Sequence, residues 1–143
     1  MIVRSTLAAS ALFLASQASV AADVDAGAKS FNKCKSCHVI ESADETIVRG
    51  GKVGPNLYAV SGRTAGSQDG FNYSKIMVAA GEQGLVWNEE DFVGYVADPT
   101  AYLREFTGDS KGRGKMNFKI TKPEEAANLW AYLVSVAPEG GGS

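Results

Sequence analysis

The two cysteines and the one histidine of the chain stand within five consecutive residues, Cys34-Lys35-Ser36-Cys37-His38. In a helical turn, residues three and four positions apart lie on one face, so both sulfurs and the imidazole would point the same way. This C-x-x-C-H spacing is typical of c-type haem attachment, in which two thiols bind the haem covalently and the adjacent histidine reaches the iron. The motif therefore predicts a fold built around a covalently bound haem.

Other uses of a C-x-x-C motif fit the chain less well. A closed structural zinc site takes four ligands, and the chain offers only two cysteines and one histidine. A thioredoxin-like dithiol would stand at the head of a βαβ unit, and no such pattern follows the motif. A disulfide between Cys34 and Cys37 is the remaining alternative to haem attachment.

The N-terminal segment has the pattern of an export signal. Arg4 supplies positive charge, residues 7–15 are mostly apolar, and Ser19-Val20-Ala21-Ala22 provides small residues for cleavage. A membrane span needs about 20 apolar residues, so this run is too short for an uncleaved anchor. We expect a signal peptide over residues 1–22, with cleavage one residue earlier as an alternative. The mature protein, residues 23–143, would be located in the periplasm.

Length and charge limit the remaining classes. A chain of 143 residues supports one domain with a modest core. The net charge of −2 does not predict nucleic-acid binding, and no internal repeat is present. We therefore expect a monomer that does not bind nucleic acid and does not span a membrane.

Helical segments are predicted along the mature chain, separated by polar, glycine-rich stretches. Their expected starts are, in order, Asp23 or Asp25, Tyr73, Asn88, Asp98 with Pro99, and Thr121 in a capping box with Glu124. No segment alternates apolar and polar residues as a half-buried strand does, and the stretch after His38 is predicted to be a surface loop. The predicted fold class is all-α, with long loops that wrap the haem and make it part of the core.

A sixth iron ligand decides between electron transfer and small-molecule binding. A haem held only by His38 would be open to small molecules, whereas a second protein ligand would close the site. With no second histidine, a methionine thioether is the leading candidate. Met116 stands on a glycine-rich loop that can fold over the open haem face, while Met77 stands mid-helix, where methionine usually fills core space. The residues favour Met116 and leave Met77 or an open site as alternatives.

Specific motifs recur in order along nearly the whole mature chain. They are Cys34 to His38, Gly54-Pro55-Asn56-Leu57, Gly62-Arg63-Thr64-Ala65-Gly66, Gly70-Phe71-Asn72-Tyr73, Trp87, Tyr95 with Asp98-Pro99, Lys115-Met116-Asn117-Phe118, and Leu129-Trp130-Ala131-Tyr132-Leu133. In this order they closely resemble class I cytochromes c, and among them the larger bacterial cytochromes c2. The resemblance implies the cytochrome c fold, in which short helices and long loops surround one haem c and the N- and C-terminal helices cross.

The resemblance also implies roles for single residues. Cys34 and Cys37 would bind the haem through two thioethers, and His38 and Met116 would be the axial ligands of the iron. The other implied cofactor-binding residues are Pro55, which would accept a hydrogen bond from the histidine ring, Arg63, Tyr73 and Trp87, which would donate to the haem propionates, and Tyr95, which would lie near the methionine sulfur.

Comparison with mitochondrial cytochrome c identifies shared and divergent features. The crossed-helix contact of the family predicts that Gly27 and Phe31 meet Leu129 and Tyr132. The loops after the histidine and before the sixth ligand are longer in this chain. Two residues at the haem also differ, since Gly114 and Met77 replace a threonine and an asparagine of that relative.

The function implied by the resemblance is that of a soluble one-electron carrier rather than an enzyme. It would take electrons from a membrane cytochrome bc complex and deliver them to a photosynthetic reaction centre or a terminal oxidase. Two other classes stay open from the residues alone, an enzyme or gas-binding cytochrome with an open iron and a periplasmic dithiol oxidoreductase without haem.

Basic residues also predict a positive docking surface at the exposed haem edge; they are Lys33, Lys35, Lys111, Arg113, Lys115 and Lys119.

Overall fold

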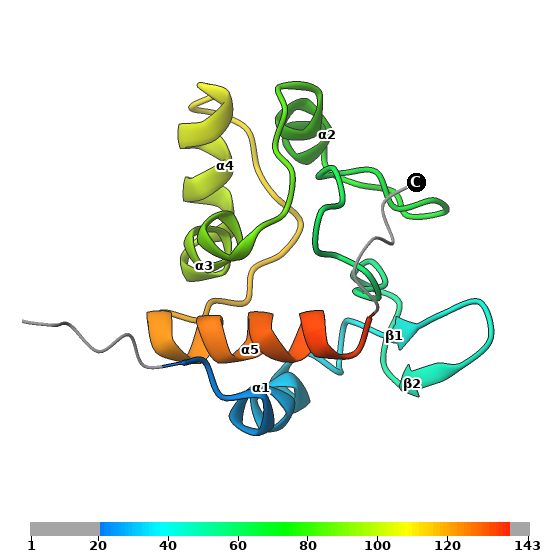
Figure 1. The fold of residues 1–143 in the computed structure, drawn as a ribbon. Coiled ribbons are helices and arrows are strands. Elements are labelled where there is room, and N and C mark those ends of the chain that lie inside the picture. Colours follow the sequence, from blue (N-terminus) through cyan, green and yellow to red (C-terminus); the bar gives the residue numbers. More distant parts are fainter. Residues whose placement is uncertain (1–20, 138–143) are drawn as a thin grey trace, which may run out of the picture.

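The computed structural model describes residues 21–137, so most of the predicted signal peptide, residues 1–20, lies outside the described residues. Within that range most of the regular secondary structure is helical and long loops join the helices, which confirms the predicted fold class (Figure 1). The elements are, in order, α1 (Val24–Ser30), the 3-10 turn η1 (Phe31–Lys33), β1 (Ile40–Glu41), β2 (Thr46–Val48), α2 (Lys75–Glu82), α3 (Glu89–Ala97), α4 (Pro99–Thr107) and α5 (Pro123–Ser135). None of the helices in the described range is long and apolar enough to cross a membrane.

Side-chain caps begin the first four helices. Asp23, Ser74, Asn88 and Asp98 each accept a hydrogen bond from the backbone N–H three residues later. Each bond satisfies an N–H group that the first helical turn leaves without a partner. Pro99 at the first position of α4 has no N–H to lose and a φ suited to a helix start. The predicted starts of α1, α3 and α4 are confirmed, and α2 starts two residues later than predicted.

Two predictions about local structure are wrong. The capping box is not formed, because α5 begins at Pro123 with Lys122 as its N-cap and no side chain bonded to its first turn. Proline starts this helix instead, with its fixed φ. The stretch after His38 is not only loop, since β1 and β2 form a short antiparallel hairpin in which Ile40 pairs with Val48. Strands of two and three residues are too short to show an alternation of apolar and polar side chains in the sequence.

The first and last described helices cross at the base of the molecule in Figure 1. A Cβ on Gly27 of α1 would lie 2.8 Å from the Cβ of Tyr132 and closer still to the carbonyl of Asn128 in α5. Only glycine permits this backbone approach. Next to it, Phe31 packs on Tyr132 with ring centroids 5.8 Å apart, and Leu129 is buried in the core. The predicted crossed-helix contact is confirmed.

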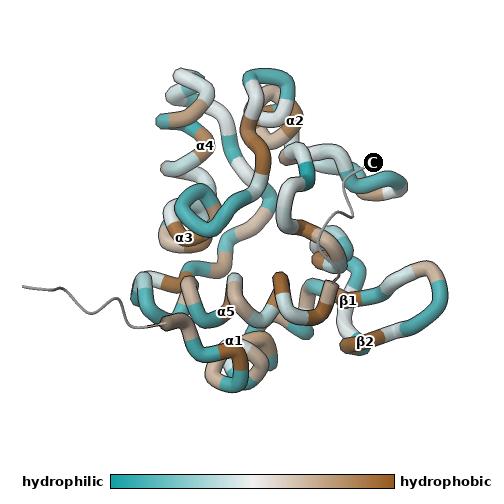
Figure 2. Tube along the Cα trace, in the orientation of Figure 1, coloured by the Kyte–Doolittle hydropathy of each residue, from teal (hydrophilic) through white to brown (hydrophobic). Residues whose placement is uncertain are grey.

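Residues 85–87, which join α2 to α3, are hydrophobic, and two of them, Leu85 and Trp87, are buried in the core (Figure 2). It pairs with an earlier loop through three backbone hydrogen bonds: Gly62 N–H to the Trp87 carbonyl (2.9 Å), Trp87 N–H to the Arg63 carbonyl (3.0 Å) and Ala65 N–H to the Leu85 carbonyl (2.9 Å). Gly62 adopts a φ of 77°, which favours glycine. The pairing brings Arg63 and Trp87, remote in sequence, to the same place.

Candidate functional site

The C-x-x-C-H motif forms a helical turn directly after η1. The N–H of His38 donates to the carbonyl of Cys34 (2.9 Å), and the N–H of Cys37 donates to the same carbonyl (3.1 Å). The three side chains are half-buried, and both cysteines are free thiols. The turn therefore presents two thiols and an imidazole at the spacing that the sequence predicted, without the alternative disulfide.

The chemistry of the Cys34 thiol argues against a redox dithiol. Burial, with a smaller contribution from Cys37, raises the pKa of Cys34 to about 11. A catalytic dithiol needs the opposite, because the thiolate is the nucleophile and its pKa is lowered in such enzymes. A protonated, half-buried thiol fits a structural or covalently bound cysteine better.

The His38 ring is held in one orientation by the turn that follows β2. Its Nδ1 lies 2.7 Å from the carbonyl oxygen of Pro55, which can only accept, so Nδ1 carries the proton and Nε2 keeps its lone pair. A Cβ on Gly54 would lie 2.7 Å from Nδ1 and 2.8 Å from Nε2, so the ring rests directly on the glycine backbone. Burial lowers the pKa of His38, which keeps the imidazole neutral as metal binding requires.

Backbone hydrogen bonds fasten this turn to the motif. The N–H of Gly51 donates to the carbonyl of Lys35, and that of Gly54 to the carbonyl of Cys37, each over 2.8 Å. We call residues 34–38 with residues 50–55 the histidine turn. Main-chain hydrogen bonds join its two halves, so residues 50–55 are attached to the motif without the help of side chains.

Arg63 is a half-buried cation whose partners are neutral oxygens. Its Nη2 donates to the Asn56 carbonyl (2.9 Å), and its Nη1 donates to the Gln68 side chain. Burial lowers the pKa of the guanidinium, which nonetheless stays charged in proteins. Among residues 21–137 no carboxylate forms an ion pair with it. A half-buried cation without an acidic partner favours an anionic group in this position, as a haem propionate would be.

The other predicted propionate donors lie near Arg63. Burial raises the pKa of Tyr73, and the charge of Arg63 opposes that rise, which places the two side chains close together. Trp87 is only 8% exposed, and its ring packs on that of Tyr95 with 5.0 Å between centroids. The structure thus brings Arg63, Tyr73, Trp87 and Tyr95 into one region.

The two candidate methionines differ in burial. Met77 is 7% exposed within the hydrophobic core, as expected of a core-filling residue in α2. Met116 is half-buried and packs at the edge of the same core, to which Tyr95 also belongs. The thioether of Met116 is therefore the less enclosed of the two.

Sequence reasoning missed residues that support the site. The Asn56 side chain donates to the Glu41 carbonyl (2.6 Å) and accepts from the backbone N–H groups of Glu41 (3.1 Å) and Tyr58 (3.0 Å). It thereby fixes the turn that presents Pro55 and the carbonyl that Arg63 binds. The only signal was the position of Asn56 directly after Gly54-Pro55.

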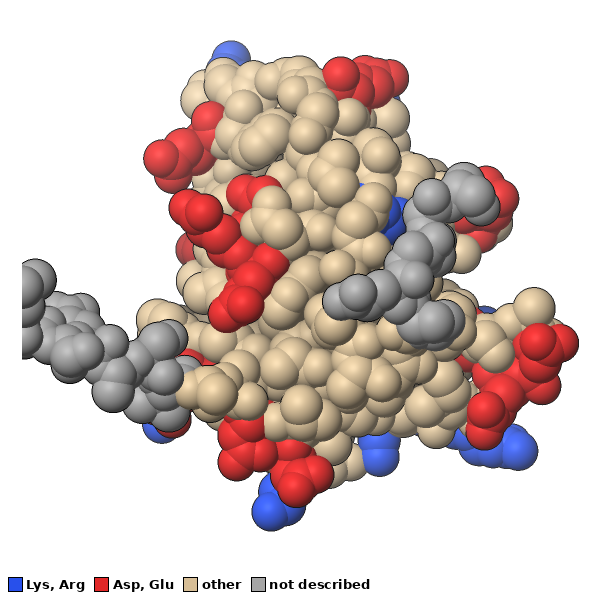
Figure 3. All heavy atoms as spheres, in the orientation of Figure 1, with Lys and Arg blue, Asp and Glu red and all other residues tan. Residues whose placement is uncertain are grey.

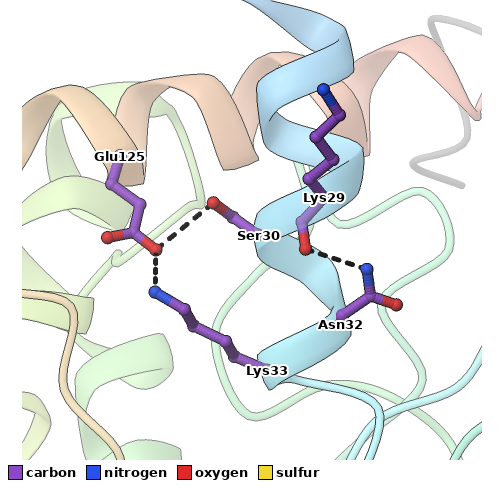
Figure 4. A network of polar contacts seen from close by, with 5 residues as sticks. All are labelled: Lys29, Ser30, Asn32, Lys33 and Glu125. Atoms are coloured by element: carbon purple, nitrogen blue, oxygen red, sulfur yellow. Dashed lines mark hydrogen bonds and ion pairs between the residues drawn. The ribbon is translucent and has the colours of Figure 1, made fainter.

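Ion pairs reduce the positive surface that the sequence predicted. Lys33 lies 2.6 Å from Glu125, which also accepts from Ser30 (Figure 4), and Lys119 lies 2.6 Å from Asp98. On the face drawn in Figure 3, acidic side chains gather over α3 and α4. Of the six predicted docking cations, two are therefore neutralised by a neighbouring carboxylate.

The chain is similar in sequence and in structure to known proteins over most of its length. The family model described as Cytochrome c matches residues 24–137. Cytochrome c2 of Cereibacter sphaeroides is 54% identical over 118 residues, which cover 80% of this chain and 95% of that protein. Cytochrome c2 of Rhodovulum adriaticum is 54% identical over 119 residues, covering 82% and 94%. The X-ray structure of cytochrome c2 from Rhodobacter sphaeroides superposes with a TM-score of 0.77 at 53% identity, covering 80% of this chain and 95% of that one.

Proposed function

The chain belongs to the cytochrome c family, as a class I member of the bacterial cytochrome c2 type, and from this we propose that it is a soluble periplasmic electron carrier with His38 and Met116 as axial iron ligands. Proteins of this family are electron carriers, not enzymes, and hold haem c through two thioethers. When bound, the haem supplies one-electron chemistry by cycling between Fe(III) and Fe(II).

The contact between His38 and Pro55 is the observation that carries the proposal. With Nδ1–H donated to the Pro55 carbonyl at 2.7 Å, Nε2 is left as the ligating nitrogen. Cys34 and Cys37, three residues apart on the same turn, would form the two thioethers. The histidine turn would therefore fix the ring beside the point of covalent attachment.

Met116 would close the other side of the iron. A thioether stabilises Fe(II) relative to harder ligands and so raises the reduction potential. Tyr95, buried in the same core, would donate a hydrogen bond to the sulfur. Because both axial positions would then be filled by protein, small molecules would be excluded and electron transfer would remain.

Arg63, Tyr73 and Trp87 would hold the haem propionates. A carboxylate removed from water needs charged or polar donors, and Arg63 offers a half-buried charge with no acidic partner among the described residues. Their shared region supports this assignment. The same charge would also raise the potential, because a fixed cation disfavours Fe(III).

The partners would be membrane complexes met by diffusion. We propose a cytochrome bc complex as electron donor and a photosynthetic reaction centre or terminal oxidase as acceptor, with the carrier itself a monomer. Lys35, Lys111 and Arg113 are exposed and form no ion pair with residues 21–137. Such charges would steer encounters with an acidic partner surface.

Two matched variants test the ligation. In Met116→Ala, oxidised protein should lose the weak far-red band that arises from sulfur-to-iron charge transfer, and the reduced protein should gain CO binding. Met77→Leu, a core substitution of similar volume, should leave both unchanged. The reverse pattern would contradict the assignment of Met116.

A further inference from the structure

The segment that carries Met116 is attached to α4 by two side chains of that helix. The guanidinium Nε of Arg104 donates to the carbonyl of Gly112 (2.7 Å). The Oγ1 of Thr100 accepts from the backbone N–H of Gly114 (3.2 Å). Both bonds are partly buried. Figure 1 shows α4 and the following segment, drawn in orange, side by side. Both attachments lie within four residues of sequence before Met116, at Gly112 and Gly114.

Two further attachments follow Met116. Lys119 pairs with Asp98, the N-cap of α4, at 2.6 Å, and the N–H of Ile120 donates to the carbonyl of Val96 in α3 (2.7 Å). As the chain advances through this segment, its partners move back along α4 into α3. The segment therefore runs antiparallel to the helix, and Met116 lies between the two sets of anchors. We call residues 112–119 the methionine segment.

The turn leading into the methionine segment is shaped by its own contacts. The carboxylate of Asp109 accepts from the N–H groups of Lys111 and Gly112, each over 3.0 Å. A Cβ on Gly112 would lie 3.0 Å from the Cβ of Ile76 in α2 and 2.7 Å from Asp109. The segment is therefore pressed between α2 and α4 at the residue that Arg104 binds.

Met116 has no such anchor of its own. Within the described part of the chain, no hydrogen bond involves its backbone, and its side chain is half-buried. Its position must follow from the anchors on either side. Of these, the bonds to Thr100 and Arg104 are partly buried, whereas the Lys119 and Asp98 side chains are 50% and 43% exposed and screened by solvent.

We propose that Thr100 and Arg104 are positioning residues, which hold the methionine segment on α4 and set how readily the Met116 sulfur leaves the iron. The inference rests on the proposed function, in which Met116 is the sixth ligand. Thr100 acts by accepting the Gly114 N–H and Arg104 by donating to the Gly112 carbonyl. Loss of either bond leaves a partly buried group without a partner and increases the population in which the segment is detached.

The test uses substitutions that remove or keep the group that makes each contact. Thr100→Val keeps the shape of the side chain and removes the acceptor, whereas Thr100→Ser keeps the acceptor. We expect Thr100→Val and Arg104→Leu to increase the rate of CO binding to the reduced holoprotein about fivefold to tenfold, with Thr100→Ser close to wild type. Glu105→Gln, an exposed change on the same helix, should have no effect.

Amide hydrogen exchange gives an independent reading. The Gly114 N–H should exchange about fivefold to tenfold faster in Thr100→Val than in wild type, and Thr100→Ser should restore its protection. A Thr100→Val variant that melts earlier yet keeps the wild-type CO rate would make the residue merely structural and overturn the proposal. If Thr100→Val does not fold, an unprotected Gly114 N–H in wild type would overturn it equally.

The far-red band separates the two proposals. Its absence from oxidised wild-type protein would overturn Met116 ligation and this inference together. Its presence, with unchanged CO rates in Thr100→Val and Arg104→Leu, would overturn the positioning role alone.

Discussion

The histidine turn and the methionine segment hold their ligands by different means. In the histidine turn, Gly51 and Gly54 donate main-chain hydrogen bonds to main-chain carbonyls, and the Pro55 carbonyl binds the ring itself. In the methionine segment, the anchors before the ligand pass through the side chains of Thr100 and Arg104. Main-chain bonds persist whatever the side chains are, whereas side-chain anchors can be tuned by single substitutions. The histidine side of the site is accordingly fixed, and the methionine side is adjustable.

The same substitution should have very different effects in the two regions. In Gly54→Ala the new Cβ would clash with the His38 ring, so we expect a loss of about 3 kcal/mol or more in unfolding free energy and a displaced ligand. In Gly114→Ala the nearest atoms lie 3.3 Å away on Leu103 and 3.5 Å away on Thr100, and the cost should stay below about 1 kcal/mol. Denaturant unfolding of both holoproteins measures this. Equal losses would remove the distinction between the regions.

Arg63 extends the histidine side, because it binds the carbonyl of Asn56 next to Pro55. Arg63→Leu should lower the reduction potential, since removing a fixed positive charge stabilises Fe(III). It should also cost roughly 1–3 kcal/mol of stability if a propionate loses its charged donor. Redox titration and melting curves measure both effects. Unchanged values would reduce Arg63 to a surface residue.

Charges on the two sides should contribute unequally to docking. Arg113→Glu in the methionine segment should slow association with an acidic partner severalfold and leave the electron-transfer step within the complex nearly unchanged. Lys33→Gln should do less, because Glu125 already neutralises this cation. The wild-type rate should fall as salt shortens the Debye length toward about 8 Å. Stopped-flow kinetics across a salt series measures the association rate. A rate that stays constant or rises with salt would contradict electrostatic docking.

The smallest effect is expected for the Lys33–Glu125 pair beside the histidine turn. The hydrogen bond from Lys33 holds the pKa of Glu125 below its ordinary value of 4.5. On acidification, Glu125 is therefore protonated at a higher pH in the unfolded chain than in the folded one. The pair stabilises the fold above the ordinary pKa of Glu125, and this contribution is lost as the pH falls through the lower pKa of the folded state. Glu125→Gln should cost less than about 1 kcal/mol at neutral pH and nothing in acid. A cost that grew on acidification would contradict the sign of the shift.

The histidine side was far easier to predict than the methionine side. Cys34 to His38 are consecutive, so their shared face follows from local spacing, whereas the contact of His38 with Pro55, 17 residues later, was implied by the family resemblance. The caps at Asn88 and Asp98 are local as well. Thr100 and Arg104 carry no motif, because their partners are loop carbonyl and N–H groups that only the packed structure brings near. The strands of the β1–β2 hairpin are too short to show an alternation, whereas Pro123 at the start of α5 was a local signal that the expected capping box displaced.

Amide exchange in the unmodified holoprotein tests the contrast most directly. The Gly54 N–H, bonded to the Cys37 carbonyl, should be among the best protected, whereas the Gly114 N–H, bonded to the Thr100 hydroxyl, should open well before global unfolding. Native-state exchange in low denaturant gives the opening free energy of each amide in one experiment. The account predicts a clearly larger opening free energy for Gly54. Equal values, or a larger one for Gly114, would contradict a fixed histidine side and an adjustable methionine side.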